Sequence, residues 1–217
     1  MVVPTKEFFP ERYAGDHASA MIVFQRIKEL MGMGDWHCEF VQRRSEEQEL
    51  KADLSRSGVL GQTSSQGAAG TFFSPPEKNV VITYSASLLR DPEGLVATLS
   101  HELCHYLLAV VREEPPCTWK DLEPLTDLSA VLEGFGIFLC NSAFKFEQWT
   151  GVSTQGWSAK RSGYLNEAEL GFALAISCVR NRLDVKIAAR SLRPNPRQVF
   201  RDALDYVAAL EEDEGGS

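Results

Sequence analysis

Two histidines and a glutamate have the spacing of a metal-binding catalytic motif in the segment HELCH, which runs from His101 to His105. On a helix of 3.6 residues per turn, positions four apart project from one face, so both imidazoles can reach one Zn²⁺ at about 2.0–2.1 Å. Glu102 lies one position round the helix, where it can reach a metal-bound water and act as a general base in hydrolysis. The alternative interpretation is a pair of histidines satisfied by hydrogen bonds in a helical interface.

A catalytic zinc usually has three protein ligands and a water, so the two histidines need a partner. The downstream candidates are Glu123, Asp127 and Glu133. Glu123 and Asp127 are four apart and share a helix face, whereas Glu133 lies about 80° away from the direction of Glu123 at 100° per residue. Cys104, inside the motif, is more typical of a small buried residue than of a ligand. His37 has only Cys38 as a neighbouring ligand type, which favours a structural role.

This pattern resembles that of the gluzincin metallopeptidases, the thermolysin-like clan. Members carry HExxH on one helix and Glu-x-x-x-Asp on the next, with about 18 or 19 residues intervening. Here His105 is followed by 17 residues and then by the segment EPLTD, from Glu123 to Asp127. The resemblance implies that Glu123 is the third zinc ligand and that Asp127 holds a ligand imidazole in its tautomer. The slightly shorter linker leaves Asp127 open as the ligand instead.

Small residues followed by aromatic ones occupy positions 67–73, which suits an exposed edge strand that another backbone can approach closely. The β-branched run at 80–84 is the clearest strand in the chain. In the gluzincin family the edge strand pairs with the substrate backbone, and the resemblance therefore implies that Gly70, Thr71 and Phe72 contact substrate. The likeness covers roughly residues 67–141 and its motifs are specific.

Family enzymes also use a histidine or tyrosine to stabilise the tetrahedral oxyanion, and no motif in this chain identifies one. Tyr164 is assigned to that role by position alone, and packing of an aromatic side chain is the alternative interpretation. It lies among the glycines, serines and aromatics of a predicted loop over residues 145–165.

The predicted function is that of a zinc-dependent metallopeptidase that hydrolyses peptide bonds through a zinc-activated water, with Glu102 as general base. It requires one Zn²⁺ per chain and a peptide or protein substrate. One alternative is a zinc-binding regulatory or interaction module that keeps the architecture of the site without proteolysis. Another is hydrolysis of a non-peptide amide. The intact Glu102 favours catalysis, because a purely structural metal site needs no base beside its water.

The elements that must position these residues follow from apolar spacing and capping residues. A strand is predicted over residues 36–41 and a polar loop over 43–68. We expect Asp16, Asp91, Asp121 and Asn166 to begin helices. Predicted helices cover residues 17–31, 92–111, 122–144 and 167–182, with shorter ones at 185–192 and 196–210. Gly134 and Gly136 within the third of these indicate close helix packing rather than a nucleotide-binding loop.

The expected fold is α+β and mostly helical, with a small N-terminal sheet that has an edge strand and the HExxH helix, followed by a helical C-terminal half. Residues 1–111 are predicted to form an α/β sub-domain that ends in the HExxH helix. Residues 112–217 are predicted to form a helical sub-domain that carries the third ligand. Together they would make one compact domain with zinc in the cleft between its halves.

Composition is that of an ordinary globular protein, with 44% hydrophobic and 24% charged residues in a chain of 217. The formal net charge of −8 disfavours nucleic acid or an anionic membrane as a partner. Five scattered cysteines without a CxxC pair indicate neither a disulfide framework nor a zinc ribbon. The N-terminus lacks a basic start followed by an apolar run, so we expect no signal peptide and a cytoplasmic location.

Overall fold

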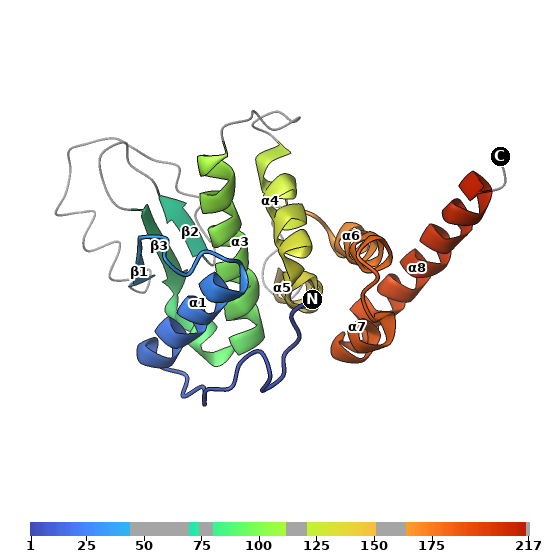
Figure 1. The fold of residues 1–217 in the computed structure, drawn as a ribbon. Helices are drawn as coiled ribbons and strands as arrows, with labels where there is room; N and C mark the ends of the chain where they lie inside the picture. The colour runs from blue at the N-terminus through green and yellow to red at the C-terminus, as the bar shows by residue number, and fades with distance from the viewer. Residues whose placement is uncertain (44–69, 74–79, 112–120, 151–163, 216–217) are drawn as a thin grey trace. The chain divides into compact units, whose positions relative to one another are not determined.

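The fold is α+β and mostly helical in the computed structural model, which describes residues 1–43, 70–73, 80–111, 121–150 and 164–215 (Figure 1). The chain divides into two compact units: an α/β unit, Glu11–Tyr106, and a helical unit that joins Met1–Pro10 to Leu107–Ser217. Their boundary falls inside a continuous helix, α3 (Pro92–Val110). The first ten residues therefore belong with the helical unit, and the union of both units into one compact domain stays a prediction.

The sheet of the α/β unit has three strands in the order β1-β3-β2 within the described residues. The central strand β3 (Val80–Ser85) pairs in parallel with β1 (Cys38–Arg43) and antiparallel with β2 (Gly70–Phe73). The predicted edge strand is thus confirmed for residues 70–73, while 67–69 and most of the predicted polar loop lie outside the described residues.

Helix α1 (His17–Leu30) packs on the sheet through aromatic rings. The Phe24 ring stacks on the Phe40 ring, with centroids 4.4 Å apart and an interplanar angle of 11°. Tyr84 of β3 is fully buried, and its hydroxyl lies 2.8 Å from Nδ1 of His17. The same hydroxyl donates to Oε1 of Gln42 at 3.4 Å, and the two contacts together satisfy a buried phenol that has lost its water partners.

Helix α3 buries one face of leucines, and that face fixes its rotation about its axis. Leu95, Leu99 and Leu103 are completely buried, as their spacing of four predicts. Its first turn is held by Asp91, whose Oδ1 accepts a hydrogen bond from the Gly94 amide at 3.2 Å. Val110, at the last position of the helix, is 49% exposed, so the buried face does not extend to the end of the helix.

The helix predicted over residues 122–144 is interrupted. Gly134 has φ +100°, in the left-handed region that glycine adopts without a Cβ clash, and its carbonyl accepts a hydrogen bond from the Val2 amide at 2.9 Å. The interruption was missed because both glycines of this stretch were attributed to packing, which is correct only for Gly136, where a Cβ would meet Leu174 Cδ1 at 2.9 Å. The stretch consists of α4 (Leu122–Ala130), a π-helical turn (Val131–Phe135) and α5 (Gly136–Thr150).

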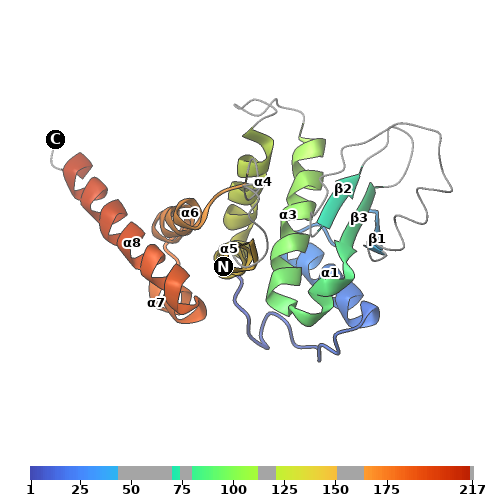
Figure 2. The same cartoon turned by 180° about the vertical axis from the view of Figure 1, so that it is seen from behind.

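The remaining helices of the helical unit are α6 (Glu167–Arg180), α7 (Val185–Ser191) and α8 (Pro194–Gly215). Both views show α6 alongside α8 (Figures 1 and 2). Helix α8 continues through the acidic residues 211–214, beyond the predicted helix end at residue 210. Helix α5 covers residues 145–150, which were predicted to belong to a loop over 145–165. Within the described part of the chain, no helix is both long and apolar enough to cross a bilayer.

The hydrogen bonds at the first turns of the helices show which of the predicted capping residues act as caps. Asp16 and Asn166 cap as expected, each accepting the backbone amide of the third helical residue, Ser19 at 2.8 Å and Glu169 at 3.0 Å. Asp121 stands at the start of α4 but makes no capping hydrogen bond. The reason is local: its φ and ψ of −99° and 6° differ from the extended backbone that aims a capping oxygen at the first turn.

The first prediction concerns Tyr84. Burial, followed by the charges of Tyr13 and Asp16, raises its pKa to about 12, whereas an unfolded tyrosine titrates near about 10. The contribution of un-ionised Tyr84 to the free energy of unfolding is complete below about pH 10. It is lost as pH rises to about 12, because the tyrosine of the unfolded chain ionises first. The melting temperature of the wild type, followed by circular dichroism from about pH 9 to 11, should therefore fall more steeply than that of Tyr84→Phe. Tyr206→Phe, at a tyrosine that is 58% exposed, should track the wild type, and parallel curves for wild type and Tyr84→Phe would contradict the assignment.

Candidate metal centre

His101 and His105 lie on successive turns of α3 with their rings close together. The ring centroids are 4.7 Å apart and the ring planes cross at 83°, so the two rings meet edge to face. His101 is buried, with 6% of its surface exposed, and His105 is half-buried. Glu102 is also buried, at 4% exposure. Two polar side chains, His101 and Glu102, are thus withdrawn from water on a helix that also buries Leu95, Leu99 and Leu103. Burial of polar groups is costly unless they have partners.

The C-terminal half of the motif helix is fastened to the start of β1. The Tyr106 hydroxyl donates to the His37 carbonyl at 3.3 Å, and the Tyr106 ring meets the Trp36 ring edge-on with centroids 4.9 Å apart. The Trp36 carbonyl in turn accepts from Nζ of buried Lys28 at 2.6 Å. His37 therefore contacts the motif helix through its carbonyl, which Tyr106 bonds, while its own side chain is exposed.

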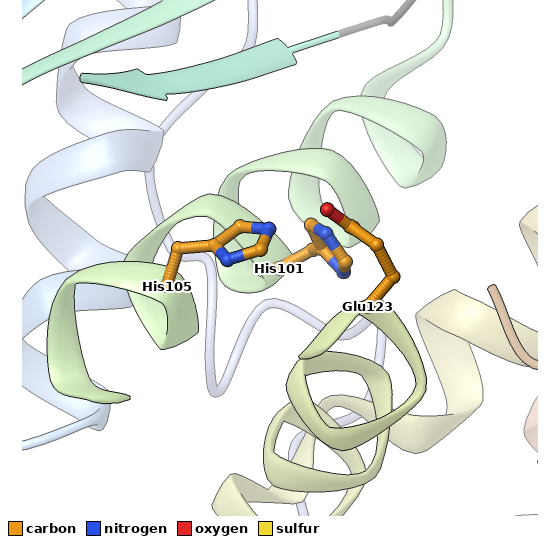
Figure 3. Close-up of side chains that lie close together, drawn as sticks. All are labelled: His101, His105 and Glu123. Carbon is orange, nitrogen blue, oxygen red and sulfur yellow. The ribbon is translucent and has the colours of Figure 1, made fainter. Parts of the chain in front are cut away.

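Glu123 of α4 belongs to the same group of possible ligands. One ligand atom from each of His101, His105 and Glu123 can be chosen so that all three lie within 4.8 Å of one another, and within the described residues this is the one such group of histidine, cysteine and carboxylate side chains. Figure 3 shows the two rings projecting from α3 and the Glu123 carboxylate extending from α4 toward them.

Two imidazoles and one carboxylate are a ligand set used by catalytic zinc sites, which leave a fourth position open. Tetrahedral bonds of about 2.0–2.1 Å put ligand atoms about 3.4 Å apart, and the three atoms of this group lie within 4.8 Å of one another. Cys104 is fully buried and is no member of this group. The donor set therefore fits a catalytic zinc better than a closed structural one.

Asp127, the other candidate ligand, is buried at 5% exposure but belongs to no ligand group in the described residues. Its Oδ2 accepts a hydrogen bond from the Leu165 amide at 2.9 Å. Tyr164, the predicted oxyanion donor, directly precedes Leu165 and is half-buried. Glu133 also stands outside the ligand group, and burial raises its pKa. The geometry favours Glu123 as third ligand.

The predicted substrate-binding residues form β2. Gly70, Thr71 and Phe72 pair with Tyr84, Thr83 and Ile82 of β3, respectively. Because β2 ends the sheet among the described strands, its second edge can offer backbone hydrogen-bonding groups to an extended peptide.

Two contacts of this centre were not anticipated from the sequence. Tyr106 next to the motif could have been noticed, because a tyrosine beside a ligand often carries a hydrogen bond. The hydrogen bond between Asp127 and the Leu165 amide joins positions 38 residues apart, and no local pattern marks such a partner.

Comparisons of the chain with protein-family models, with curated proteins and with solved structures found no match. The resemblance to gluzincins accordingly rests on the motif, its spacing and the residues that carry them.

We predict near-equimolar zinc in the purified protein. His101→Ala should abolish it, because the remaining imidazole and carboxylate cannot hold the ion tightly. The matched control is His17→Ala, which removes an imidazole bonded to Tyr84 outside the ligand group and should leave the zinc in place. Elemental mass spectrometry measures both. Wild-type protein that is zinc-free and cannot be reloaded would refute the metal centre.

A second measurement separates Glu123 from Asp127. In a chelator competition titration, Glu123→Ala should lose tight zinc binding, whereas Asp127→Ala should weaken it by about 10- to 100-fold, as expected for a residue that only supports a ligand. The opposite order would reassign the ligand to Asp127.

Proposed function

We propose that this protein is a zinc-dependent metallopeptidase. The observation that carries the proposal is the grouping of His101, His105 and Glu123 ligand atoms within 4.8 Å of one another beside the buried Glu102. A closed structural site would use four ligands and would have no use for an additional carboxylate. Two histidines, one glutamate and one adjacent base instead fit metal-assisted hydrolysis.

Each residue has a defined task in this mechanism. The two histidines and Glu123 would hold the ion, and bound Zn²⁺ lowers the pKa of a water and polarises a carbonyl. Glu102 accepts the proton of the attacking water and then delivers it to the leaving amine, which lets one carboxylate serve as base and acid. Tyr164 is the proposed hydroxyl donor to the developing oxyanion.

A peptide is the substrate that the sheet supports best. An extended chain can align with β2 and form backbone hydrogen bonds at its second edge, as strands added to a sheet do. Strand addition uses backbone hydrogen bonds along an extended chain, so it favours a polypeptide over a small amide as substrate. Gly70, Thr71 and Phe72 would form that contact.

A reducing compartment such as the cytoplasm is proposed for the protein. In the described residues Cys38, Cys104, Cys140 and Cys178 carry free thiols. Burial raises the pKa of Cys140 to about 12 and that of Cys178 to about 11, which keeps both as unreactive thiols. The burial and raised pKa values of Cys140 and Cys178 support a role for both as small core residues.

The test of the proposed chemistry is Glu102→Gln. The amide keeps the size of the side chain but cannot accept a proton, so turnover on a broad peptide library should fall by about 10²- to 10⁴-fold while zinc content stays near wild type. Glu93→Gln, the same substitution in the first turn of α3, should keep full activity.

The rival function, a zinc-binding regulatory module, gives a different result. Such a protein would bind zinc but cleave no peptide before or after the substitution. Cleavage at the wild-type rate by zinc-loaded Glu102→Gln would refute the mechanism, even if zinc binding itself is confirmed.

A further inference from the structure

The buried carboxylate of Asp127 connects two distant parts of the helical unit. Its Oδ2 accepts the Leu165 amide at 2.9 Å, and only 5% of its surface is exposed. The neighbouring polar residues of α4 behave differently: the hydroxyls of Thr126 and Ser129 donate to carbonyls of α4 itself, at 2.7 and 2.8 Å. Asp127 instead reaches out of its helix to the segment that precedes α6.

That segment is held at two successive amides. Asp127 accepts the amide of Leu165, and Oε2 of Glu169 accepts the amide of Asn166 at 2.7 Å. Asn166 in turn caps α6. Two fixed amides in succession leave little freedom for the residue just before them, Tyr164, whose Cα is about 3.8 Å from that of Leu165.

The face of α4 that carries Asp127 also carries Glu123. Residues four apart on a helix are neighbours on its surface, separated by about 6 Å along the axis. A segment bound to the Asp127 carboxylate is therefore bound next to the proposed ligand Glu123.

We propose that Asp127 is a positioning residue that fastens the segment from Tyr164 to Asn166 onto α4, and that this contact holds Tyr164 where its hydroxyl can meet a substrate bound at Glu123. The proposal rests on the proposed peptidase function for its catalytic part. It differs from the role implied by the gluzincin resemblance, in which the same carboxylate orients a ligand imidazole. The hydrogen bond to Leu165 assigns Asp127 a second task that acts on substrate rather than on zinc.

The experiment compares Asp127→Ala with Asp127→Asn in the full-length, zinc-loaded protein. Amide hydrogen exchange of Leu165, followed residue by residue by NMR, should accelerate about 10- to 100-fold in the alanine variant, because the amide loses its acceptor. Asparagine keeps an oxygen in the same place and should restore most of the protection. At saturating zinc, kcat on a library-selected peptide should fall about 10-fold or more in the alanine variant with KM little changed, and asparagine should recover it.

Asp184→Ala is the matched control. Asp184 also accepts backbone amides, those of Lys186 at 2.8 Å and Ile187 at 3.1 Å, but it does so at the start of α7. Its loss should lower stability without changing Leu165 exchange or kcat.

Unchanged Leu165 exchange in Asp127→Ala would overturn the proposal, and so would faster exchange with wild-type kcat. If asparagine restores protection of Leu165 but not kcat, the carboxylate acts through its charge and the positioning role is refuted. A wild type that takes up zinc and cleaves no peptide would overturn the proposed function and the catalytic part with it, while the exchange data would still decide whether Asp127 holds the segment.

Discussion

Withdrawal of polar groups from water on α3 is the constraint on which the rest of the structure depends. His101 and Glu102 are 6% and 4% exposed on a helix whose inner face is leucine. Burial of unpaired polar groups costs several kcal/mol by order of magnitude, on the scale of about 2–7 kcal/mol for a single neutral group. A bound metal ion would coordinate both imidazoles, and folding would then be coupled to metal binding. The leucines provide the compensating burial that keeps this helix in place.

Each unit supports its own proposed ligands. In the α/β unit, Tyr106 fastens the motif helix to the start of β1, and the Lys28 ammonium holds the same stretch from the side of α1. In the helical unit, helix α4, which carries the proposed ligand Glu123, is followed by a π-helical turn, where the Gly134 carbonyl accepts a hydrogen bond from the Val2 amide. Metal ligands require this kind of rigid support, because small displacements of a ligand weaken the site.

Local signals in the sequence predicted the parts of the structure that local physics determines. The helix of the motif, the cap at Asp16 and the edge strand followed from periodicity, capping and composition. The left-handed conformation of Gly134 could not be predicted in this way, because a glycine within a helical pattern looks the same in the sequence whether it allows close packing or interrupts the helix. The hydrogen bond between Asp127 and the Leu165 amide could not be predicted either, because a contact across 38 residues depends on how the helices assemble. The proposed ligand group lay between these cases, since its two histidines form a local motif and its glutamate was assigned through a family resemblance.

Anomalous diffraction at the zinc absorption edge, from crystals of the zinc-loaded protein, tests the central claim most directly. The account predicts a single strong peak per chain, bound by imidazole nitrogens of His101 and His105 and by the carboxylate of Glu123, with bond lengths of about 2.0–2.2 Å. A peak coordinated by Cys104, a peak whose carboxylate ligand is Asp127, or zinc bound only at the protein surface would contradict it.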